Sequence, residues 1–196
     1  MYKHFFKRVF DFVGALILLP FVLLVIIILA PFIWLTDKGP VFYDAERMGK
    51  DGRIFKMFKL RSMYVNAPDI RNNDGSTFNS NKDPRVTPIG RILRKTSLDE
   101  FPQFINVLLG DMSLVGPRPS LTTTPYSDYD DVRRKRVSVR PGVTGYSQAY
   151  YRNSISQEEK FKYDAHYVDN ISLWLDIKIL FKTVFSVLSS KNINTK

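Results

Sequence analysis

The stretch FVGALILLPFVLLVIIILAPFIWLT, residues 12–36, contains 25 consecutive residues without a charged side chain. As a straight α-helix it would be about 37 Å long, against about 30 Å for the hydrocarbon core of a bilayer. A cleaved signal peptide has an apolar run of only about 7–15 residues followed by an A-x-A site, and this site is missing here. A helix that is apolar on all sides needs a membrane or a large protein around it. The stretch therefore predicts a membrane-associated helix.

Two prolines leave the path of this helix through the membrane open. Pro20 and Pro31 each remove a backbone donor and clash with the preceding turn, although membrane helices tolerate such kinks. A kinked helix can cross the bilayer, or it can bend enough to return to the leaflet that it came from. Lys3, Lys7 and Arg8 favour a cytoplasmic N-terminus. A spanning helix would then place the rest of the chain outside, whereas a re-entrant helix would keep both ends in the cytoplasm.

Outside this stretch the chain is polar and basic, and its composition excludes several classes of protein. The 196 residues hold 29 Lys and Arg against 19 Asp and Glu, a formal charge of +10. Without cysteine there can be no disulfide scaffold, Cys-ligated zinc, iron–sulfur cluster or thiol nucleophile. Two histidines make a His-based metal site or a Ser-His-Asp triad implausible. Neither a G-x-G-x-x-G loop nor a Walker A motif occurs, so any nucleotide must be held by side chains, a metal ion and irregular loops.

Residues 38–196 are expected to form a small, mostly helical α+β domain beside the membrane-associated segment 1–37. A short β-hairpin is predicted from an extended stretch over 41–43, a turn over 47–52 and a strand over 54–60. Helices are expected over 89–93, 97–110, 130–136, 157–168 and 172–188. Residues 66–87 and 140–145 are interpreted as loops, the first of them exposed. The last helix is amphipathic, and its Trp174 and Lys178/Lys182 side suits a membrane interface as well as a packed core.

The stretch Thr96-Ser-Leu-Asp-Glu-Phe-Pro-Gln103 places two carboxylates, Asp99 and Glu100, at the start of an expected helix. Adjacent like charges disfavour each other, so the pair requires a nearby cation. Mg²⁺ prefers carboxylate oxygens, and a carboxylate can also attack phosphorus to give an acyl phosphate. The structural alternative is strong, because Ser97 and Glu100 fit a capping box and Asp99 complements the helix dipole.

Basic residues elsewhere permit two kinds of function. Arg118 lies between two prolines, which suits bidentate phosphate binding but also a turn with a solvated arginine. Lys59 and Arg61 can face an anionic substrate or merely keep a strand edge soluble. The run Arg133-Arg-Lys-Arg136 is interpreted as solvated or facing lipid headgroups, since nearby aspartates would weaken binding to nucleic acid. An enzyme acting on phosphates and a non-catalytic, membrane-anchored basic scaffold that binds anionic lipid both remain open.

Six short motifs are spaced along the chain. They are Lys7-Arg-Val-Phe-Asp11, Lys38-Gly-Pro-Val-Phe42, Phe58-Lys-Leu-Arg-Ser-Met63, Arg94-Lys-Thr-Ser-Leu-Asp-Glu-Phe-Pro-Gln103, Asn106-Val-Leu-Leu-Gly-Asp-Met-Ser-Leu-Val-Gly-Pro-Arg-Pro119 and Arg140-Pro-Gly-Val-Thr-Gly145. In this order and spacing they resemble the bacterial sugar transferases, the monotopic phosphoglycosyl transferases, in their minimal form. The resemblance covers residue 7 to about residue 187, and it is the combination of motifs that is specific.

The resemblance implies the transfer of sugar-1-phosphate from a UDP-sugar to polyprenol (undecaprenyl) phosphate with release of UMP, the first membrane step of glycan assembly. By motif, Asp99 would be the nucleophile that forms a covalent phosphosugar enzyme and would bind Mg²⁺. Glu100 would assist through Mg²⁺ geometry or proton transfer. Metal and basic side chains neutralise charge in such phosphoryl transfer. The residues assigned to substrate binding are Lys59, Arg61, Arg94, Gln103, Arg118 and Arg140.

The resemblance also implies a re-entrant helix on the cytoplasmic face of the bacterial inner membrane, bent at a Ser-Pro pair. Here the aligned residues are Leu23-Leu24, so Pro20 and Pro31 are the candidate bends. Nucleotide sugars are cytoplasmic and polyprenol phosphate lies in the inner leaflet, which favours a re-entrant over a spanning helix. The expected partners are UDP-sugar, polyprenol phosphate and inner-leaflet lipid, without nucleic acid, and a homodimer is compatible with them. Residues 151–155 and 158–161 resemble members that handle N-acetylated sugars.

Overall fold

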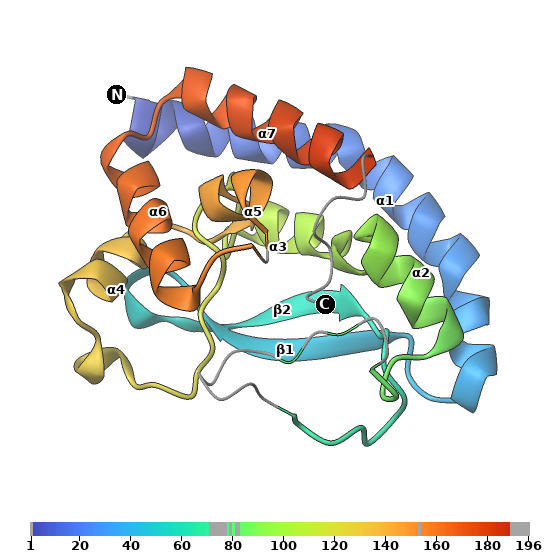
Figure 1. The fold of residues 1–196 in the computed structure, drawn as a ribbon. Coiled ribbons are helices and arrows are strands. Elements are labelled where there is room, and N and C mark those ends of the chain that lie inside the picture. The colour runs from blue at the N-terminus through green and yellow to red at the C-terminus, as the bar shows by residue number, and fades with distance from the viewer. Residues whose placement is uncertain (1, 71–77, 79, 81–82, 153, 189–196) are drawn as a thin grey trace.

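The computed structural model of the protein describes residues 2–70, 78, 80, 83–152 and 154–188. After a π-helical turn at Tyr2–Phe6, its helices and strands are α1 (Lys7–Asp37), β1 (Phe42–Met48), β2 (Ile54–Leu60), α2 (Pro88–Thr96), α3 (Gln103–Leu109), β3 (Ser113–Val115), α4 (Asp131–Arg136), β4 (Gly142–Thr144), α5 (Tyr146–Tyr150), α6 (Gln157–Asp169) and α7 (Leu173–Leu188). Short 3₁₀ turns cover Lys50–Gly52, Leu98–Glu100 and Tyr126–Asp128. The expected α+β class is confirmed (Figure 1).

The first sheet is an antiparallel hairpin of β1 and β2, in which Phe42 lies opposite Leu60 and Met48 opposite Ile54. The predicted strand over 54–60 is confirmed. The first strand is longer than predicted, because it continues through Met48 and leaves a tighter turn. Only Ala45 and Met48 of β1 are buried, so the strand lacks the apolar alternation that would have revealed it.

The second sheet pairs β3 with β4 in parallel, so the interpretation of residues 140–145 as a loop is wrong for β4. The two strands approach so closely that a Cβ on Gly142 would lie 2.1 Å from the backbone nitrogen of Gly116. Glycine is therefore required at this contact. A three-residue strand whose partner lies about thirty positions away leaves no local sequence pattern.

The predicted helices are found as α2, α4, α6 and α7, whereas α5 was not predicted. The helix expected over 97–110 begins later, at Gln103, because Ser97 has φ 58° and the chain first forms the 3₁₀ turn Leu98–Glu100. In the expected exposed loop over 66–87, residues 71–77, 79 and 81–82 lie outside the described residues. The exposed interpretation is wrong at its end, where Asp83 and Arg85 are buried as an ion pair of 2.7 Å.

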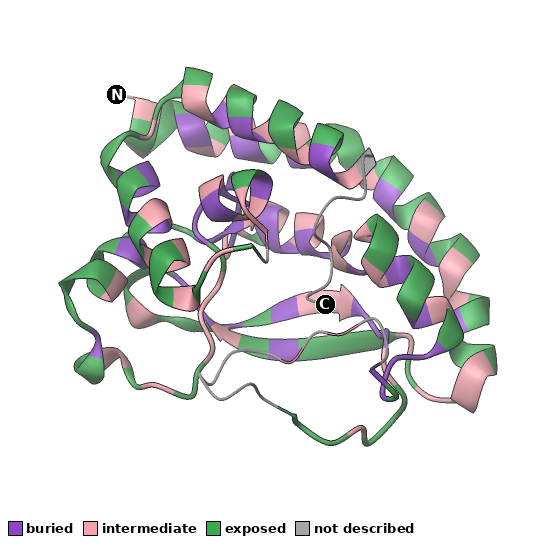
Figure 2. Ribbon diagram, viewed as in Figure 1, coloured by how far each residue is buried: buried purple, intermediate pink, exposed green. Residues whose placement is uncertain are grey.

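Helix α1 is continuous through Pro20 and Pro31, and by length and composition it could cross a membrane. A narrow stripe of Ala15, Val22, Ile26 and Ile33 is buried against the rest of the protein. Figure 1 shows α1 curving over the domain, first near α7 and then near α2. Its outer side remains exposed along its length (Figure 2). The helix thus offers a long apolar surface while lying on the domain.

Both ends of α1 are fixed to the domain by polar contacts. Near its start, Lys7 Nζ lies 2.7 Å from Asp176 Oδ2 of α7, and the Leu114 amide donates to Asp11. At its end, the Arg61 guanidinium binds both carboxylate oxygens of Asp37 at 2.6 and 2.7 Å. These contacts hold the two ends of the apolar helix against one and the same globular unit.

Helix α7 has a packed side and an exposed side, and both are apolar in part. Ile179 is fully buried in the core with residues of α1, β3 and α6. On the other side Trp174, Phe181 and Phe185 are 65%, 75% and 60% exposed. The two interpretations of this helix from the sequence therefore each describe one of its sides.

Candidate active site

Two carboxylates lie in the turn that connects α2 to α3. Helix α2 ends at Thr96, and the left-handed backbone of the next residue, Ser97, reverses the chain before the 3₁₀ turn that carries Asp99 and Glu100. Asp99 is buried, with only 8% of its surface exposed. Ser97 makes no side-chain cap, and the Glu100 carboxylate turns to basic side chains instead. The capping-box interpretation of this pair is therefore wrong.

Lys59, near the end of β2, is the closest cation to both carboxylates. Its Nζ atom lies 2.8 Å from Glu100 Oε1 and 3.8 Å from Asp99 Oδ2. The fully buried Asn106 of α3 fixes this strand, since its side chain accepts from the Phe58 amide at 3.0 Å and donates to the Lys56 carbonyl at 2.8 Å. Asn106 thereby ties β2 to the helix that follows the carboxylates. Its only signal in the sequence was a polar residue within an apolar helix.

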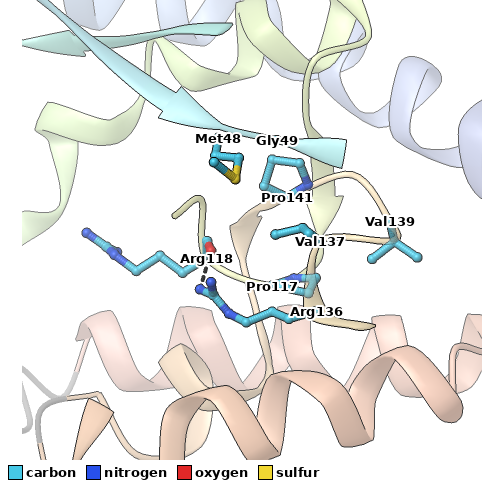
Figure 3. Close-up of a pocket in the computed structure, with 8 residues that line it drawn as sticks. All are labelled: Met48, Gly49, Pro117, Arg118, Arg136, Val137, Val139 and Pro141. Atoms are coloured by element: carbon cyan, nitrogen blue, oxygen red, sulfur yellow. Dashed lines mark hydrogen bonds between the residues drawn. The ribbon is translucent and has the colours of Figure 1, made fainter. Parts of the chain in front are cut away.

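Arg118 approaches from the turn after β3, with its Nη2 atom 3.6 Å from Glu100 Oε1. The buried Arg136 of α4 donates a hydrogen bond to the Arg118 carbonyl (Figure 3). Its Nε atom also lies 2.8 Å from Asp164 Oδ2 of α6. Arg136 thus fixes the backbone of Arg118. The Arg118 side chain extends away from Arg136 (Figure 3). The cavity drawn there, of about 10 Å³, has room for about one water molecule and none for a sugar nucleotide.

Two further arginines add positive charge to the pair. Arg94 of α2 is half-buried and donates from Nε to Ser62 Oγ at 2.9 Å, and its charge opposes the rise in the pKa of Asp99 that burial causes. Arg152, in the connection after α5, interacts electrostatically with Glu100. Its backbone has φ 50°, a region that non-glycine residues enter only at some cost. The sequence did not identify Arg152 as a site residue, although it lies in the segment 151–155 that resembled members handling N-acetylated sugars.

This environment shifts the pKa values of the two carboxylates in opposite directions. Burial raises the pKa of Asp99 and the charge of Glu100 adds to this, while Lys59 and the arginines oppose it. Burial also disfavours the Glu100 carboxylate, but Lys59 and Arg118 outweigh burial and lower its pKa to about 2. Glu100 is therefore a fixed anion, and Asp99 is a poorly stabilised carboxylate. A functional site is where such divergence is expected.

The carboxylate oxygens of Asp99 are available to accept hydrogen bonds or to bind a ligand. Among the described residues, none donates a hydrogen bond to its carboxylate, and its ion pair with Lys59 is long at 3.8 Å. No group of three or more His, Cys, Asp or Glu residues that could hold a metal occurs in the described part of the chain. Mg²⁺, however, commonly binds through one or two carboxylates together with substrate phosphates. Asp99 fits such a shared site, whereas a complete protein cage is not formed by these residues.

The remaining predicted site residues lie at different places. Arg61 is buried in its ion pair with Asp37 and also donates to the Pro40 carbonyl, so it secures α1. Gln103 is buried in the first turn of α3. Arg140 is exposed and donates to the Gly110 carbonyl at 2.8 Å, beyond the far end of α3. The structure thus brings Lys59, Arg94 and Arg118 to the carboxylates, but not Arg61 or Arg140.

The fold and the site define an α+β protein with one long apolar helix and a carboxylate pair among cations. Residues 2–190 match the family model described as bacterial sugar transferase. The chain belongs to this family. It is 44% identical over 197 residues to a UDP-galactose-lipid carrier transferase of Erwinia amylovora, and 39% identical over 203 residues to an undecaprenyl-phosphate galactose phosphotransferase of Salmonella typhimurium. These alignments cover 95% of the chain but 41% of each relative.

A shorter relative matches nearly end to end. The chain is 42% identical over 188 residues to an uncharacterized sugar transferase, EpsL, of Bacillus subtilis, with 95% of the chain and 89% of the relative covered. The family is therefore established by a relative of similar length. The longer relatives, of which the chain spans less than half, carry the names that specify substrates.

Proposed function

We propose that the protein transfers sugar-1-phosphate from a UDP-sugar to undecaprenyl phosphate and releases UMP. The observation that carries this proposal is a buried carboxylate, Asp99, with free oxygen lone pairs beside Lys59, Arg94 and Arg118. The names of the longer relatives combine a UDP-sugar donor with a lipid-carrier acceptor. A site with more cations than carboxylates suits two substrates that both bring phosphates.

The reaction would proceed in two displacements at one phosphorus. An Asp99 carboxylate oxygen attacks the sugar-bearing phosphorus, a P–O bond forms, and the bond to the UMP oxygen breaks with its electron pair leaving on UMP. A phosphate oxygen of the lipid then attacks the same phosphorus. The acyl-phosphate bond breaks, the Asp99 carboxylate returns, and a polyprenyl diphosphosugar leaves. Covalent catalysis of this kind divides one difficult transfer into two easier ones.

The neighbouring residues have separate tasks in this scheme. Glu100 stays ionised and holds Lys59 at 2.8 Å, which keeps the ammonium beside the reacting oxygen. Arg118, Arg94 and Arg152 are placed to balance the charge of the diphosphate. Mg²⁺ held by Asp99 and the substrate phosphates would neutralise charge on the leaving group. Basic side chains on a rigid frame provide the positioning on which phosphoryl transfer depends.

The membrane placement that we propose is monotopic, on the cytoplasmic face of the inner membrane. Both ends of α1 are fixed to the same domain through Asp176 and Arg61, so crossing the bilayer would draw polar parts of the domain into lipid. The exposed sides of α1 and α7 would instead rest in one leaflet. Reporters fused to the two termini should both be cytoplasmic, and reporters on opposite sides would contradict this placement.

The reaction is tested with purified protein in phospholipid nanodiscs containing polyprenol phosphate. A panel of UDP-sugars, including N-acetylated ones, should identify a donor that gives Mg²⁺-dependent UMP release. Label from the sugar phosphate should remain on the protein without acceptor, be released by hydroxylamine, and be absent in Asp99→Asn. If no donor gives UMP release while the protein still binds anionic vesicles, the scaffold alternative replaces the enzyme.

A further inference from the structure

Helix α2 carries positive charge on two sides. Its sequence PIGRILRKT contains three basic residues and no acidic one. Arg94 is half-buried and reaches Ser62 near the carboxylates. Arg91 and Lys95 are exposed and lie four residues apart, which places them as neighbours on the helix surface. The inner cation is used by the candidate active site, and the outer pair has no role in it.

Helix α2 packs against α1, and the other side of α1 is an exposed apolar surface. Leu93 is fully buried in a cluster with Val22, Ile26 and Ile33 of α1. In the same part of α1, the large apolar residues Ile27, Ile28 and Phe32 are 68%, 54% and 56% exposed. On α2 itself Ile92 is 57% exposed, and it neighbours Lys95 on the helix surface, three residues away. An exposed apolar residue beside cations is typical of a surface at the boundary between hydrocarbon and headgroups.

The exposed cations of α4 and one exposed cation of α7 already have partners. On α4, Arg133 lies 3.6 Å from Asp130 and Lys135 lies 2.7 Å from Asp169. On α7, Lys178 lies over the ring of Trp174. Within the described residues, neither Arg91 nor Lys95 makes an ion pair with an acidic residue. The outer face of α2 therefore has uncompensated positive charge beside a membrane-facing surface.

We propose that this face, made of Arg91, Ile92 and Lys95, binds the phosphate of the acceptor lipid at the bilayer surface before it reaches the active site. The inference rests on the proposed transfer reaction. The cations would attract the lipid phosphate, and Ile92 would contact the first carbons of its chain. Lys95 is separated from Asp99 by one tight turn, and Arg94 on the inner side is the next cation. Helix α2 would thus connect the membrane surface to the reacting carboxylate.

The test uses the full chain in vesicles with the double variant Arg91→Gln/Lys95→Gln. We expect the KM for bilayer-embedded polyprenol phosphate to rise about tenfold, since each cation near a membrane surface favours an anionic headgroup severalfold. The KM for the UDP-sugar and single-turnover UMP release without acceptor should stay at wild-type values. The charge-conserving Arg91→Lys/Lys95→Arg should restore the acceptor KM. Lys50→Gln/Arg53→Gln, in the turn of the hairpin far from α2 (Figure 1), is the matched loss of two charges and should change neither KM.

The lipid composition separates the acceptor from bulk anionic lipid. The defect should occur both in phosphatidylcholine vesicles and in vesicles mixed with phosphatidylglycerol. A defect confined to the mixed vesicles would mean that the pair binds bulk lipid, and an unchanged acceptor KM would also overturn the inference. Circular dichroism checks that the variant is folded. Absence of UMP release in the wild-type protein would contradict the proposed reaction itself, which is a different outcome.

Discussion

Asp176 and Asp99 are both buried carboxylates, but their surroundings treat them in opposite ways. Asp176 is fully buried and accepts from Tyr2 Oη at 2.6 Å, Lys7 Nζ at 2.7 Å and Tyr167 Oη at 2.6 Å. Asp99 has a cation at 3.8 Å and, among the described residues, no hydrogen-bond donor. The acceptor sites of Asp176 are occupied by donors from the fold. Those of Asp99 remain available to bind a substrate or a metal ion.

This difference in hydrogen bonding distinguishes a buried carboxylate that stabilises the fold from one that is available for chemistry. The contacts of Asp176 join the start of α1 to α6 and α7, so its desolvation is offset by three strong hydrogen bonds. The raised pKa of Asp99 reflects burial that the surrounding cations only partly offset. A protein gains no stability from such a group, whereas a nucleophile or metal ligand requires free lone pairs. Changes at the two positions should therefore affect different quantities.

The largest effect is expected from Asp99→Asn. Loss of the nucleophile should lower the rate of UMP release by about 10⁴-fold or more. The free energy of unfolding at pH 7 should be unchanged or higher, because a neutral amide replaces a carboxylate whose charged form is disfavoured by burial. Rates and thermal unfolding are measured on the same preparation. A variant that unfolds but retains its activity per folded molecule would reverse the assignment.

The opposite result is expected for Asp176→Asn. The change leaves the buried Lys7 ammonium without its close partner, so the free energy of unfolding should fall by about 3 kcal/mol. Turnover of the protein that remains folded should stay close to wild type. Denaturant unfolding in detergent measures the loss, and Lys7→Met/Asp176→Asn is the matched pair that removes both charges while keeping an acceptor for the tyrosine hydroxyls. If this double variant is no more stable than Asp176→Asn, the ion pair is not the cause.

A smaller, pH-dependent effect is expected for Asp83→Asn. Hydrogen bonds from Arg85 hold the pKa of Asp83 below its ordinary value, so the folded protein binds the proton less readily than the unfolded chain. The stabilisation is therefore complete above the unfolded pKa of about 4 and is lost as the pH falls through the lower folded value. At pH 7 the variant should lose about 2 kcal/mol, and the difference between the two proteins should shrink as the pH falls below the unfolded pKa. A difference that persists unchanged in acid would contradict this linkage.

The sequence predicted those parts of the molecule that depend on local pattern. The apolar run of α1, the strand β2 and the helix α6 follow from composition and periodicity within a few residues. The assignment of Lys59 to the same site as Asp99 came from matching motifs, because the forty residues between them give no local reason for contact. Asp176 was missed for the same reason, since within an amphipathic helix it resembles an ordinary solvated residue.

The structure places Arg61 and Ser97 differently from what their positions in the sequence suggested, and both differences have a common cause. Arg61 follows Lys59 by two positions, so a strand would direct both side chains to one side. Arg61 lies beyond the end of β2, however, where the chain turns toward α1, and its guanidinium forms an ion pair with Asp37. The capping box at Ser97 failed because Lys59 and Arg118 provide stronger partners for Glu100 than a backbone amide does. Partners distant in sequence decided both cases.

The smallest effect is expected at Arg140, which the sequence treated like Arg118. Arg118→Gln removes a charge 3.6 Å from Glu100 and should lower kcat/KM for the UDP-sugar by about 10²-fold. Arg140→Gln removes one hydrogen bond to the Gly110 carbonyl at the C-terminal end of α3. It should cost less than about 1 kcal/mol of stability and change kcat/KM by less than about twofold, because that helix end is separated from Asp99 by about 10 Å of helix. Comparable losses of activity in both variants would show that the substrate extends along α3 to its far end, and the boundary of the site would then have to include Arg140.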